Sequence, residues 1–293
     1  MIVVTGATGN IGSKISSRLL DQGQKIRCIA RTEEKLRQLA NKGAEIAAGS
    51  LDNAAFLTKQ FSGAEAVFTM IPPKYTAEDF RAYQNTIGAS IASAIQKSGV
   101  NHIVDLSSQG AHLPDGTGLI KGLHDQEERL NGIPGINILH MRPAYFMENL
   151  LANLDMIRNN NMMGSALRSG LMMPMIATQD IAAFAACRLS KRDFSGISVK
   201  NLLGQRDISM NEAAAVIAAK TSRQGLHYVQ FSYEDTEKAL AGLGFSPNVA
   251  RLFIEMSRAI NERLIMDTPR TPENTTETSF EEFAEIFVRL LAS

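Results

Sequence analysis

A strand, a glycine loop and a helix follow one another within the first 21 residues of the chain. Ile2–Thr5 is a short apolar run typical of a buried β-strand, and it is followed at once by the loop. Three glycines mark this loop: Gly6, Gly9 and Gly12. We expect a helix over Ile11–Asp21, which Gly23 ends. This order of elements is typical of the first βα unit of a doubly wound sheet.

The first half of the chain continues to alternate short β-rich runs with longer helical patterns. Five further strands are expected, at Lys25–Ala30, Ala44–Ala48, Ala64–Ile71, His102–Leu106 and Ile136–Met141. Glu33–Lys42 predicts a helix, and another opens with a capping box, Thr76-x-x-Asp79, and ends at Gly99. Because parallel strands need crossover connections, the alternation predicts an α/β fold with a parallel, doubly wound sheet of the Rossmann type.

The glycine loop is suited to the pyrophosphate of a nicotinamide dinucleotide. Gly6 permits the tight turn, Gly9 lets the backbone approach the pyrophosphate, and Gly12 lets the helix pack closely on the strand. The helix N-terminus adds free N–H groups and a partial positive charge. The predicted cofactor contacts in this loop are Gly6, Thr8, Gly9, Asn10, Ile11 and Gly12.

The end of the second expected strand indicates which dinucleotide is bound. Arg31 stands 19 residues beyond Gly12, where an acidic residue would bind the ribose 2′-hydroxyl of NAD. Its guanidinium suits a 2′-phosphate instead, and Lys35 supplies a second cation one helical turn later. We therefore expect NADP(H) in preference to NAD(H), the alternative being that both cations are solvated surface charges. Further cofactor contacts are expected at Ser50, Thr69, Ser107 and Ser108.

The chain after Pro143 differs in character from the first half. Residues 1–145 should form the dinucleotide-binding domain, together with a returning strand near 197–204 and the last helix, 279–292. A smaller, mostly helical lobe is expected from 146–278. Capping boxes predict helices that open after Ser209, Ser232 and Ser279.

Composition limits the class of partner. The chain has 30 Lys+Arg and 30 Asp+Glu, and a nucleic-acid binder needs a basic surplus, so direct nucleic-acid binding is not expected. No apolar run approaches the roughly 18 residues of a membrane span, and a strand at Ile2 leaves no room for a signal peptide. Cys28 and Cys187 form no CxxC pair. We expect a cytoplasmic protein with a small-molecule substrate, no metal and no membrane contact.

Several segments resemble the NmrA-like branch of the atypical short-chain dehydrogenase/reductase superfamily. They are Gly6–Gly12 with Arg31, Asn85–Gly88, Ser98–Val104, Ser107 with Ser108, Arg142–Asn149 and Pro272–Thr276. The resemblance implies a Rossmann domain that binds NADP. It also implies one of two functions: an NADPH-dependent reductase of quinones, azo dyes or triphenylmethane dyes, or a redox sensor that binds NADP without turnover and acts through a partner protein.

The sequence departs from this superfamily at two positions. The usual acid is a Tyr with Lys four residues later, and none of the five tyrosines has Lys at that spacing. This disfavours a third function, sugar-nucleotide epimerisation or isomerisation, which normally relies on that pair. In addition, Ser50 stands where the superfamily usually has an Asp after Gly49.

The resemblance places the catalytic helix at Leu119–Leu130. His124 is near the position where the branch often has Lys or His, and a histidine can donate a proton near neutral pH. The alternative is an exposed pairing of His124 with Glu128. Lys121 is the second catalytic candidate, with a surface charge as its alternative, and His112 in the preceding loop is the third.

An apolar pocket is the last expectation from the sequence. Residues 141–175 hold eight of the 13 methionines, which either fill the core or form an adaptable wall over the nicotinamide. The predicted pocket residues are Met141, Tyr145 and Phe146. The leading hypothesis is therefore hydride transfer from NADPH to a small, apolar, conjugated acceptor, with little need for acid–base groups.

Overall fold

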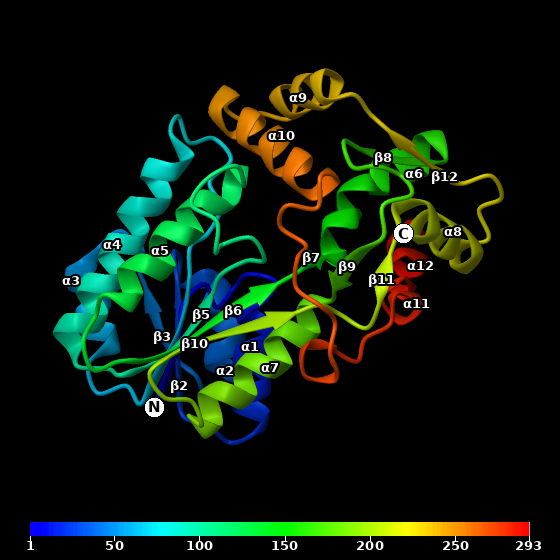
Figure 1. Ribbon diagram of the computed structural model, residues 1–293. Coiled ribbons are helices and arrows are strands. Elements are labelled where there is room, and N and C mark those ends of the chain that lie inside the picture. The colour runs from blue at the N-terminus through cyan, green and yellow to red at the C-terminus, as the bar shows by residue number, and fades with distance from the viewer. Residues whose placement is uncertain (293) are drawn as a thin grey trace.

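The computed structural model describes residues 1–292 and contains a central parallel sheet (Figure 1). Seven strands follow the order β10-β6-β5-β4-β1-β2-β3, and every neighbouring pair is parallel. Their bounds are β1 Ile2–Val4, β2 Ile26–Ala30, β3 Glu45–Ala48, β4 Ala66–Met70, β5 His102–Leu106, β6 Asn137–Pro143 and β10 Ile197–Leu202. This is the doubly wound Rossmann sheet that the sequence predicts, and β10 is the expected returning strand.

Helices cover both faces of the sheet. Their bounds are α1 Gly12–Asp21, α2 Arg37–Asn41, α3 Ala54–Phe61, α4 Phe80–Ser98, α5 Lys121–Asn131 and α7 Thr178–Lys191. Val3 and Val67 point to the face covered by α3, α4 and α5, whereas Val4 and Phe68 point to α1, α2 and α7. Successive side chains of a strand alternate between faces, so strands buried on both faces need continuous apolar runs. This requirement explains why the strands could be found in the sequence.

The rest of the chain forms a smaller, mostly helical lobe (Figure 1). Its helices are α6 Leu154–Asn160, α8 Met210–Thr221, α9 Tyr233–Gly242, α10 Pro247–Asn261, α11 Phe280–Phe283 and α12 Glu285–Ala292. Its strands are β7 Tyr145–Phe146, β8 Met162–Ser165, β9 Met173–Ile176, β11 Asp207–Ile208 and β12 His227–Gln230. They form two small sheets, β11-β9-β7 and β12-β8. Single 3-10 segments are Glu34–Leu36, Gly118–Ile120, Met147–Asn153 and Pro272–Asn274.

Two helices pack in a different unit from the one predicted from the sequence. The last helix, expected with the first domain, packs in the smaller lobe, because Phe280, Phe283 and Phe287 join the core formed with α8. Conversely, α7 falls within residues 146–278 but covers the central sheet beside α1. Both helices are amphipathic, and periodicity shows that a helix has an apolar face without showing which core receives it.

The first residues of the helices show which of the predicted N-caps form. The hydroxyls of Ser209, Ser232 and Ser279 accept hydrogen bonds from the third following amide, as expected. By contrast, α4 begins at Phe80 with Asp79 itself as the N-cap, accepting from Ala82 N at 2.9 Å, so Thr76 does not cap it. Only Arg37–Asn41 of the helix expected over Glu33–Lys42 is α-helical, preceded by a 3-10 turn.

The Arg142–Asn149 segment supplies a cap from a distance. Ala177, the N-cap of α7, has no capping side chain, and the Glu148 carboxylate accepts instead from Thr178 N at 3.0 Å. Lys14 of α1 donates to Thr178 Oγ1 at 2.5 Å and lies 3.4 Å from Glu148. The segment thus joins α1 to the start of α7, at the boundary between the two units.

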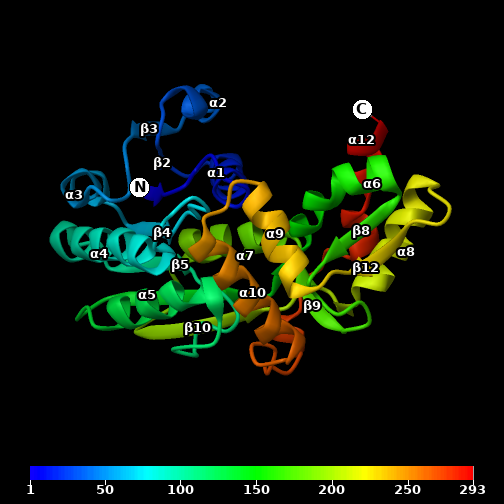
Figure 2. The same cartoon turned by 90° about the horizontal axis from the view of Figure 1, so that it is seen from above.

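Helices α9 and α10 lie between the two units (Figure 2). The rings of Tyr75 and Phe245 stack with centroids 4.7 Å apart, which attaches this pair of helices to the loop before α4. Lys121 of α5 pairs with Glu255 of α10 at 2.7 Å. Residues 262–270, here termed the connector, then lead from α10 back to the end of β10, where Arg270 donates to Gly204 O at 2.5 Å.

Candidate functional site

The glycine loop has the geometry that its spacing predicts. Gly6 adopts a φ of 60°, a left-handed conformation that favours glycine. A Cβ on Gly12 would lie 2.2 Å from the carbonyl oxygen of Gly6, so only glycine allows this approach of helix and strand. The N-cap of α1, Ile11, contributes no capping side chain. Ser13 N already donates to Gly9 O at 3.0 Å, so the other amides of the first turn of α1 are the ones suited to an anion.

The predicted loop contacts differ in exposure. Thr8, Gly9 and Asn10 are exposed at the tip of the loop. Ile11 is buried with its side chain in the core beneath the sheet, so only its backbone is placed to meet a ligand. The exposed residues surround the end of the strand where a doubly wound sheet binds its ligands.

A cavity of about 260 Å³ lies beside this loop; we term it the β2 cavity. Its lining residues are Thr8, Arg31, Thr32 and Lys35. Among residues 1–292, neither Arg31 nor Lys35 has an acid within ion-pair distance. Two exposed, uncompensated cations thus share one cavity at the mouth of the glycine loop. Ser50, also exposed, follows β3 next to the end of β2, where Gly49 N donates to Ala30 O at 2.9 Å.

Thr69 belongs to a buried polar ladder across three strands. Thr69, Asp105 and His140 stand side by side on β4, β5 and β6. The Thr69 hydroxyl donates to Asp105 at 2.8 Å, and His140 Nδ1 lies 3.0 Å from the other oxygen of Asp105. The Thr69 side chain has 0% exposure. The side chain therefore supports the sheet interior, and the cofactor contact expected at Thr69 stays a prediction.

Ser107 is tied to a buried ion pair. Its hydroxyl donates to the Glu127 carboxylate, which also accepts from Arg142 Nε at 2.9 Å. Burial alone would raise the pKa of Glu127, but hydrogen bonds from Arg142 and Ser107 and the nearby His140 hold that pKa below its usual range. Glu127 is therefore ionised near neutral pH and fixes the Ser107 hydroxyl as a donor. Ser108 is only half-buried, and its hydroxyl donates to Gln109 O at 3.0 Å.

His124 lies on α5 with its ring turned toward the preceding loop. Its Nδ1 is 2.9 Å from the carbonyl oxygen of Ala111. A carbonyl can only accept, so Nδ1 carries a proton and Nε2 remains for a second partner. The pairing with Glu128 is replaced by this backbone contact, because the loop after β5 folds over the start of α5.

The other two candidates are held by acids. Lys121 lies 2.7 Å from Glu255 and 3.3 Å from Asp115. The Glu255 contact, more than any other, raises the pKa of Lys121. This lysine thus stays protonated and anchors α5 to α10, an arrangement unsuited to proton transfer. His112 Nε2 lies 3.5 Å from Asp267 of the connector.

The three predicted pocket residues pack in two different cores. Met141 has 0% exposure and packs in the core of the central sheet, so its place in a substrate pocket is wrong. Tyr145 packs against the core of the smaller lobe, where burial raises its pKa, and Phe146 packs against the central core. Five of the eight methionines in residues 141–175 are at most 2% exposed: Met141, Met147, Met163, Met173 and Met175. Most of this cluster fills the core.

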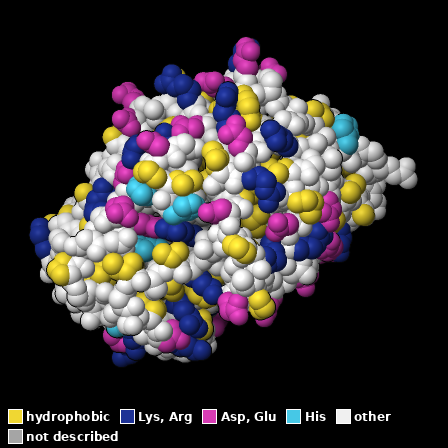
Figure 3. Space-filling model, viewed as in Figure 1, with side chains coloured by type: hydrophobic (Ala, Val, Ile, Leu, Met, Phe, Trp, Pro, Cys, Tyr) yellow, Lys and Arg dark blue, Asp and Glu magenta, His cyan; other side chains and the backbone are white. Residues whose placement is uncertain are grey.

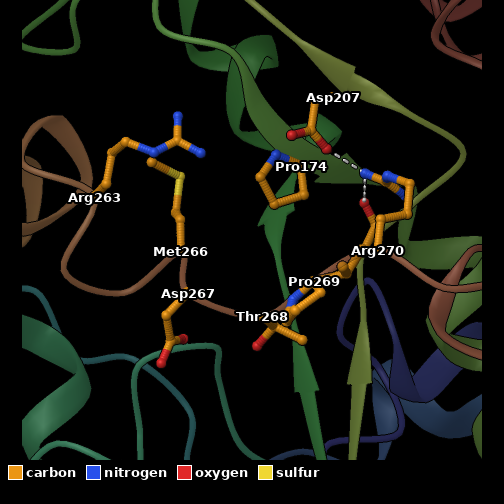
Figure 4. Close-up of a pocket in the computed structure, with 9 residues that line it drawn as sticks. Pro174, Asp207, Arg263, Met266, Asp267, Thr268, Pro269 and Arg270 are labelled. Atoms are coloured by element: carbon orange, nitrogen blue, oxygen red, sulfur yellow. Dashed lines mark hydrogen bonds and ion pairs between the residues drawn. The ribbon is translucent and has the colours of Figure 1, made fainter.

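A second cavity, which the sequence does not indicate, lies along the connector (Figure 4). This connector cavity also measures about 260 Å³. Its lining residues are Pro174, Leu203, Asp207, Arg263, Met266, Asp267, Thr268, Pro269 and Arg270. They come from β9, the end of β10, β11 and the connector. No local motif could have indicated them, because the chain folding alone brings these segments together.

Within residues 1–292, no helix has both the length and the apolar character that crossing a membrane requires. The same residues contain no group of three or more His, Cys, Asp or Glu side chains placed to hold a metal ion.

Two proteins with sequences similar to this chain are reductases. The chain is 26% identical over 288 residues to an NAD(P)H azoreductase of Xenophilus azovorans, covering 97% of each chain. It is 28% identical over 255 residues to a (4-alkanoyl-5-oxo-2,5-dihydrofuran-3-yl)methyl phosphate reductase of Streptomyces griseus, covering 87% of this chain and 85% of that one.

Solved structures share the fold over nearly the whole chain. The triphenylmethane reductase of Citrobacter sp. in complex with NADP(H) matches with a TM-score of 0.80 at 20% identity, covering 99% of this chain and 100% of that one. An NADPH-dependent quinone oxidoreductase of Escherichia coli, complexed with NADPH, matches with a TM-score of 0.77 at 21% identity, covering 98% and 99%. The model of the NmrA-like family matches residues 1–284, and the chain belongs to that family.

Proposed function

We propose that this protein is an NADPH-dependent reductase that transfers hydride to a small conjugated acceptor of the quinone or dye type. The β2 cavity carries this proposal, because it presents two uncompensated cations beside a phosphate-binding loop. The similarity to an azoreductase and to a second reductase supports the reaction class. A cytoplasmic protein acting on a small molecule is part of the same proposal.

The residues that would hold the cofactor are assigned by their exposure and charge. Thr8, Gly9 and Asn10, with the first amides of α1, would bind the pyrophosphate. Arg31 and Lys35 would bind the 2′-phosphate, since a guanidinium and an ammonium are the strong partners of that group. Ser50 would lie near the adenosine, and Ser107 and Ser108 near the nicotinamide at the end of β5.

NADPH, when bound, supplies the hydride. Reduction of a quinone or azo group also consumes a proton. His124 is the group that we assign to donate it: with the ring doubly protonated, Nε2 releases its proton while Nδ1 keeps its own toward Ala111 O. The contact of Nδ1 with Ala111 O fixes the ring and keeps Nε2 available. Lys121 is assigned to hold α5 against α10 through Glu255. Glu127 positions Ser107.

The decisive experiment follows NADPH oxidation by loss of absorbance with a panel of quinones, azo dyes and triphenylmethane dyes. The His124→Ala variant should lower kcat by about 100-fold if His124 is the acid. His227→Ala is the matched control, because His227 Nδ1 also contacts a carbonyl, Gly225 O at 2.9 Å, and His227 is exposed on β12 of the smaller lobe. The control should keep wild-type kcat.

The same experiment separates the reductase from the redox sensor. Tight NADPH binding with no oxidation above background by any acceptor would favour a sensor that acts through a protein partner. Equal loss of kcat in His124→Ala and His227→Ala would leave the reductase but remove His124 as its acid.

A further inference from the structure

The connector cavity lies at the carboxyl edge of the central sheet. Leu203 follows the last residue of β10, and β10 pairs there with β6 through Leu202 and Pro143. Pro174 precedes Met175 on β9, which pairs with Tyr145 of β7. Ligands of doubly wound sheets bind beyond the carboxyl ends of the strands, so the cavity is placed to meet part of a molecule bound at this edge.

Charged side chains of both signs are interspersed over the face seen in Figure 3. A preference for an anion must therefore come from individual groups rather than from a broad field. Four charged residues line the connector cavity, and their formal charges sum to zero: Asp207, Arg263, Asp267 and Arg270. What matters is which of these charges already has a partner.

Three of the four are engaged. Arg270 donates to Asp207, to Gly204 O at 2.5 Å and to Leu203 O at 3.3 Å. In Figure 4 a dashed line on the right of the view marks the contact between Arg270 and Asp207. Asp267 lies at the lower left, pointing away from Pro174, and is 3.5 Å from His112 of the loop after β5. These groups hold the walls of the cavity.

Arg263 differs from the other three. Among residues 1–292 its side chain has no acid within ion-pair distance, and its guanidinium makes one hydrogen bond, from Nη1 to Met172 O at 3.2 Å. A guanidinium carries five N–H donors, so most of them are left for a ligand. Figure 4 places Arg263 across the cavity from Arg270, with Pro174 between them.

The remaining walls are apolar or weakly polar. Pro174 and Leu203 form one side, and the Met266 thioether adapts to varied ligand shapes. Pockets for whole small molecules span roughly 300–1,000 Å³, so a cavity of about 260 Å³ suits one ring with its substituent rather than a complete dye.

We propose that the connector cavity binds an acidic substituent of the acceptor, a carboxylate or sulfonate on an aromatic ring, through the guanidinium of Arg263. This inference rests on the proposed reductase function and names its substrate class. Arg263 is then a specificity residue: it binds the substituent in a bidentate manner while the reacting bond lies toward the ends of β5 and β6.

The test compares two acceptors that differ only in the acid: azobenzene and azobenzene-4-carboxylate. Arg263→Gln should raise KM for the carboxylate by roughly tenfold or more and leave kcat, the KM for azobenzene and the Kd for NADPH unchanged. Arg263→Lys keeps the charge and should recover part of the loss. Arg251→Gln is the matched control, since Arg251 is an exposed arginine near the start of α10 and does not line the cavity.

The outcomes separate the two proposals. An equal change of KM for both azobenzenes, or none for either, would overturn the assignment of Arg263 while leaving the reductase intact. If the wild-type protein oxidises NADPH with neither compound, the Kd of azobenzene-4-carboxylate is measured instead, by calorimetric titration into the NADP-loaded protein. Binding that Arg263→Gln weakens roughly tenfold would keep the acidic site without the reaction, and unchanged or absent binding would overturn it.

Discussion

The β2 cavity and the connector cavity have the same volume, about 260 Å³ each, but different origins. The four residues of the β2 cavity lie within positions 8–35, on one βαβ unit whose glycines and strand ends are fixed locally. The nine residues of the connector cavity span positions 174–270 and meet only after two units have packed together. A site built on one supersecondary unit can be predicted from the spacing of residues in the sequence, whereas a site between two units cannot.

The two cavities also differ in charge. The β2 cavity has two cations without acids, which suits a group of double negative charge such as a 2′-phosphate. In the connector cavity an Arg–Asp pair is already formed, and Arg263 remains for a singly charged group. The first cavity should therefore bind its anion more strongly than the second.

The largest effect should come from Gly12, which the β2 cavity needs for its geometry. Gly12→Ala places a Cβ 2.2 Å from Gly6 O, and the backbone must shift, so we expect about 3 kcal/mol or more off the free energy of unfolding. Urea denaturation of the variant and the wild-type protein measures this difference in the free energy of unfolding. Gly242→Ala is the control, since a Cβ there would have no atom within 4 Å apart from those of its chain neighbours and its own helix backbone. Equal stability of the two variants would mean that the loop is not the tightly packed unit described.

The second effect concerns charge in the β2 cavity. Arg31→Ala should weaken NADPH by about 1.5–3 kcal/mol and leave NADH nearly unchanged, because only NADPH carries the 2′-phosphate. Arg37→Ala, an exposed arginine six residues later that does not line the cavity, should change neither. Calorimetric titration gives the Kd of NADPH and of NADH for each of the two variants, to be compared with the wild-type values. If Arg31→Ala weakened NADH binding as much as NADPH binding, Arg31 would contact a part that both cofactors share and not the 2′-phosphate.

A third, smaller effect tests the helix that carries His124. Hydrogen bonds from Arg81, its main cause, and from Asn85 lower the pKa of Asp125 to about 2. A carboxyl whose folded pKa is depressed stabilises the fold above its unfolded pKa of about 4, and this stability is lost as the pH falls toward 2. Arg81 is 41% exposed, so after screening we expect about 1 kcal/mol.

Asp125→Asn should therefore lower the free energy of unfolding by about 1 kcal/mol at pH 7, and the difference should shrink between pH 4 and pH 2. Asp155→Asn removes an exposed i,i+3 pair with Arg158 and should cost less than about 0.5 kcal/mol at any of these pH values. Urea titrations across the range provide both curves. A pH-independent loss in Asp125→Asn would indicate lost packing rather than lost charge.

The smallest effect is expected at the connector cavity. Asp267 is 61% exposed and 3.5 Å from His112, so Asp267→Asn should change the free energy of unfolding by less than about 0.5 kcal/mol. Removing its negative charge should also lower KM for azobenzene-4-carboxylate slightly and leave azobenzene unchanged. A melting curve and the two KM values suffice. A loss of stability comparable to that of Gly12→Ala would mean that both cavities are equally built into the fold.

Elements governed by local rules were predictable from the sequence. The parallel sheet follows from apolar runs between helical patterns, and the hydroxyls of Ser209, Ser232 and Ser279 cap the expected helices. The left-handed Gly6 and the close approach at Gly12 follow from glycine spacing alone. In each case the interacting groups are neighbours in the chain, so the residue types and their spacing contain the geometry.

Long-range packing decided what the sequence could not. The side chains of Thr69 and Met141 are fully buried on the faces of the sheet. His124 contacts the Ala111 carbonyl instead of Glu128, and the last helix packs in the smaller lobe. Burial of a side chain depends on which helix covers its face of the sheet, and a hydrogen-bond partner depends on which loop folds over it. By itself the sequence thus determined the dinucleotide loop and the sheet, because these depend on spacing. The tertiary structure alone decided the connector cavity and its uncompensated Arg263, because four segments had to meet to form them.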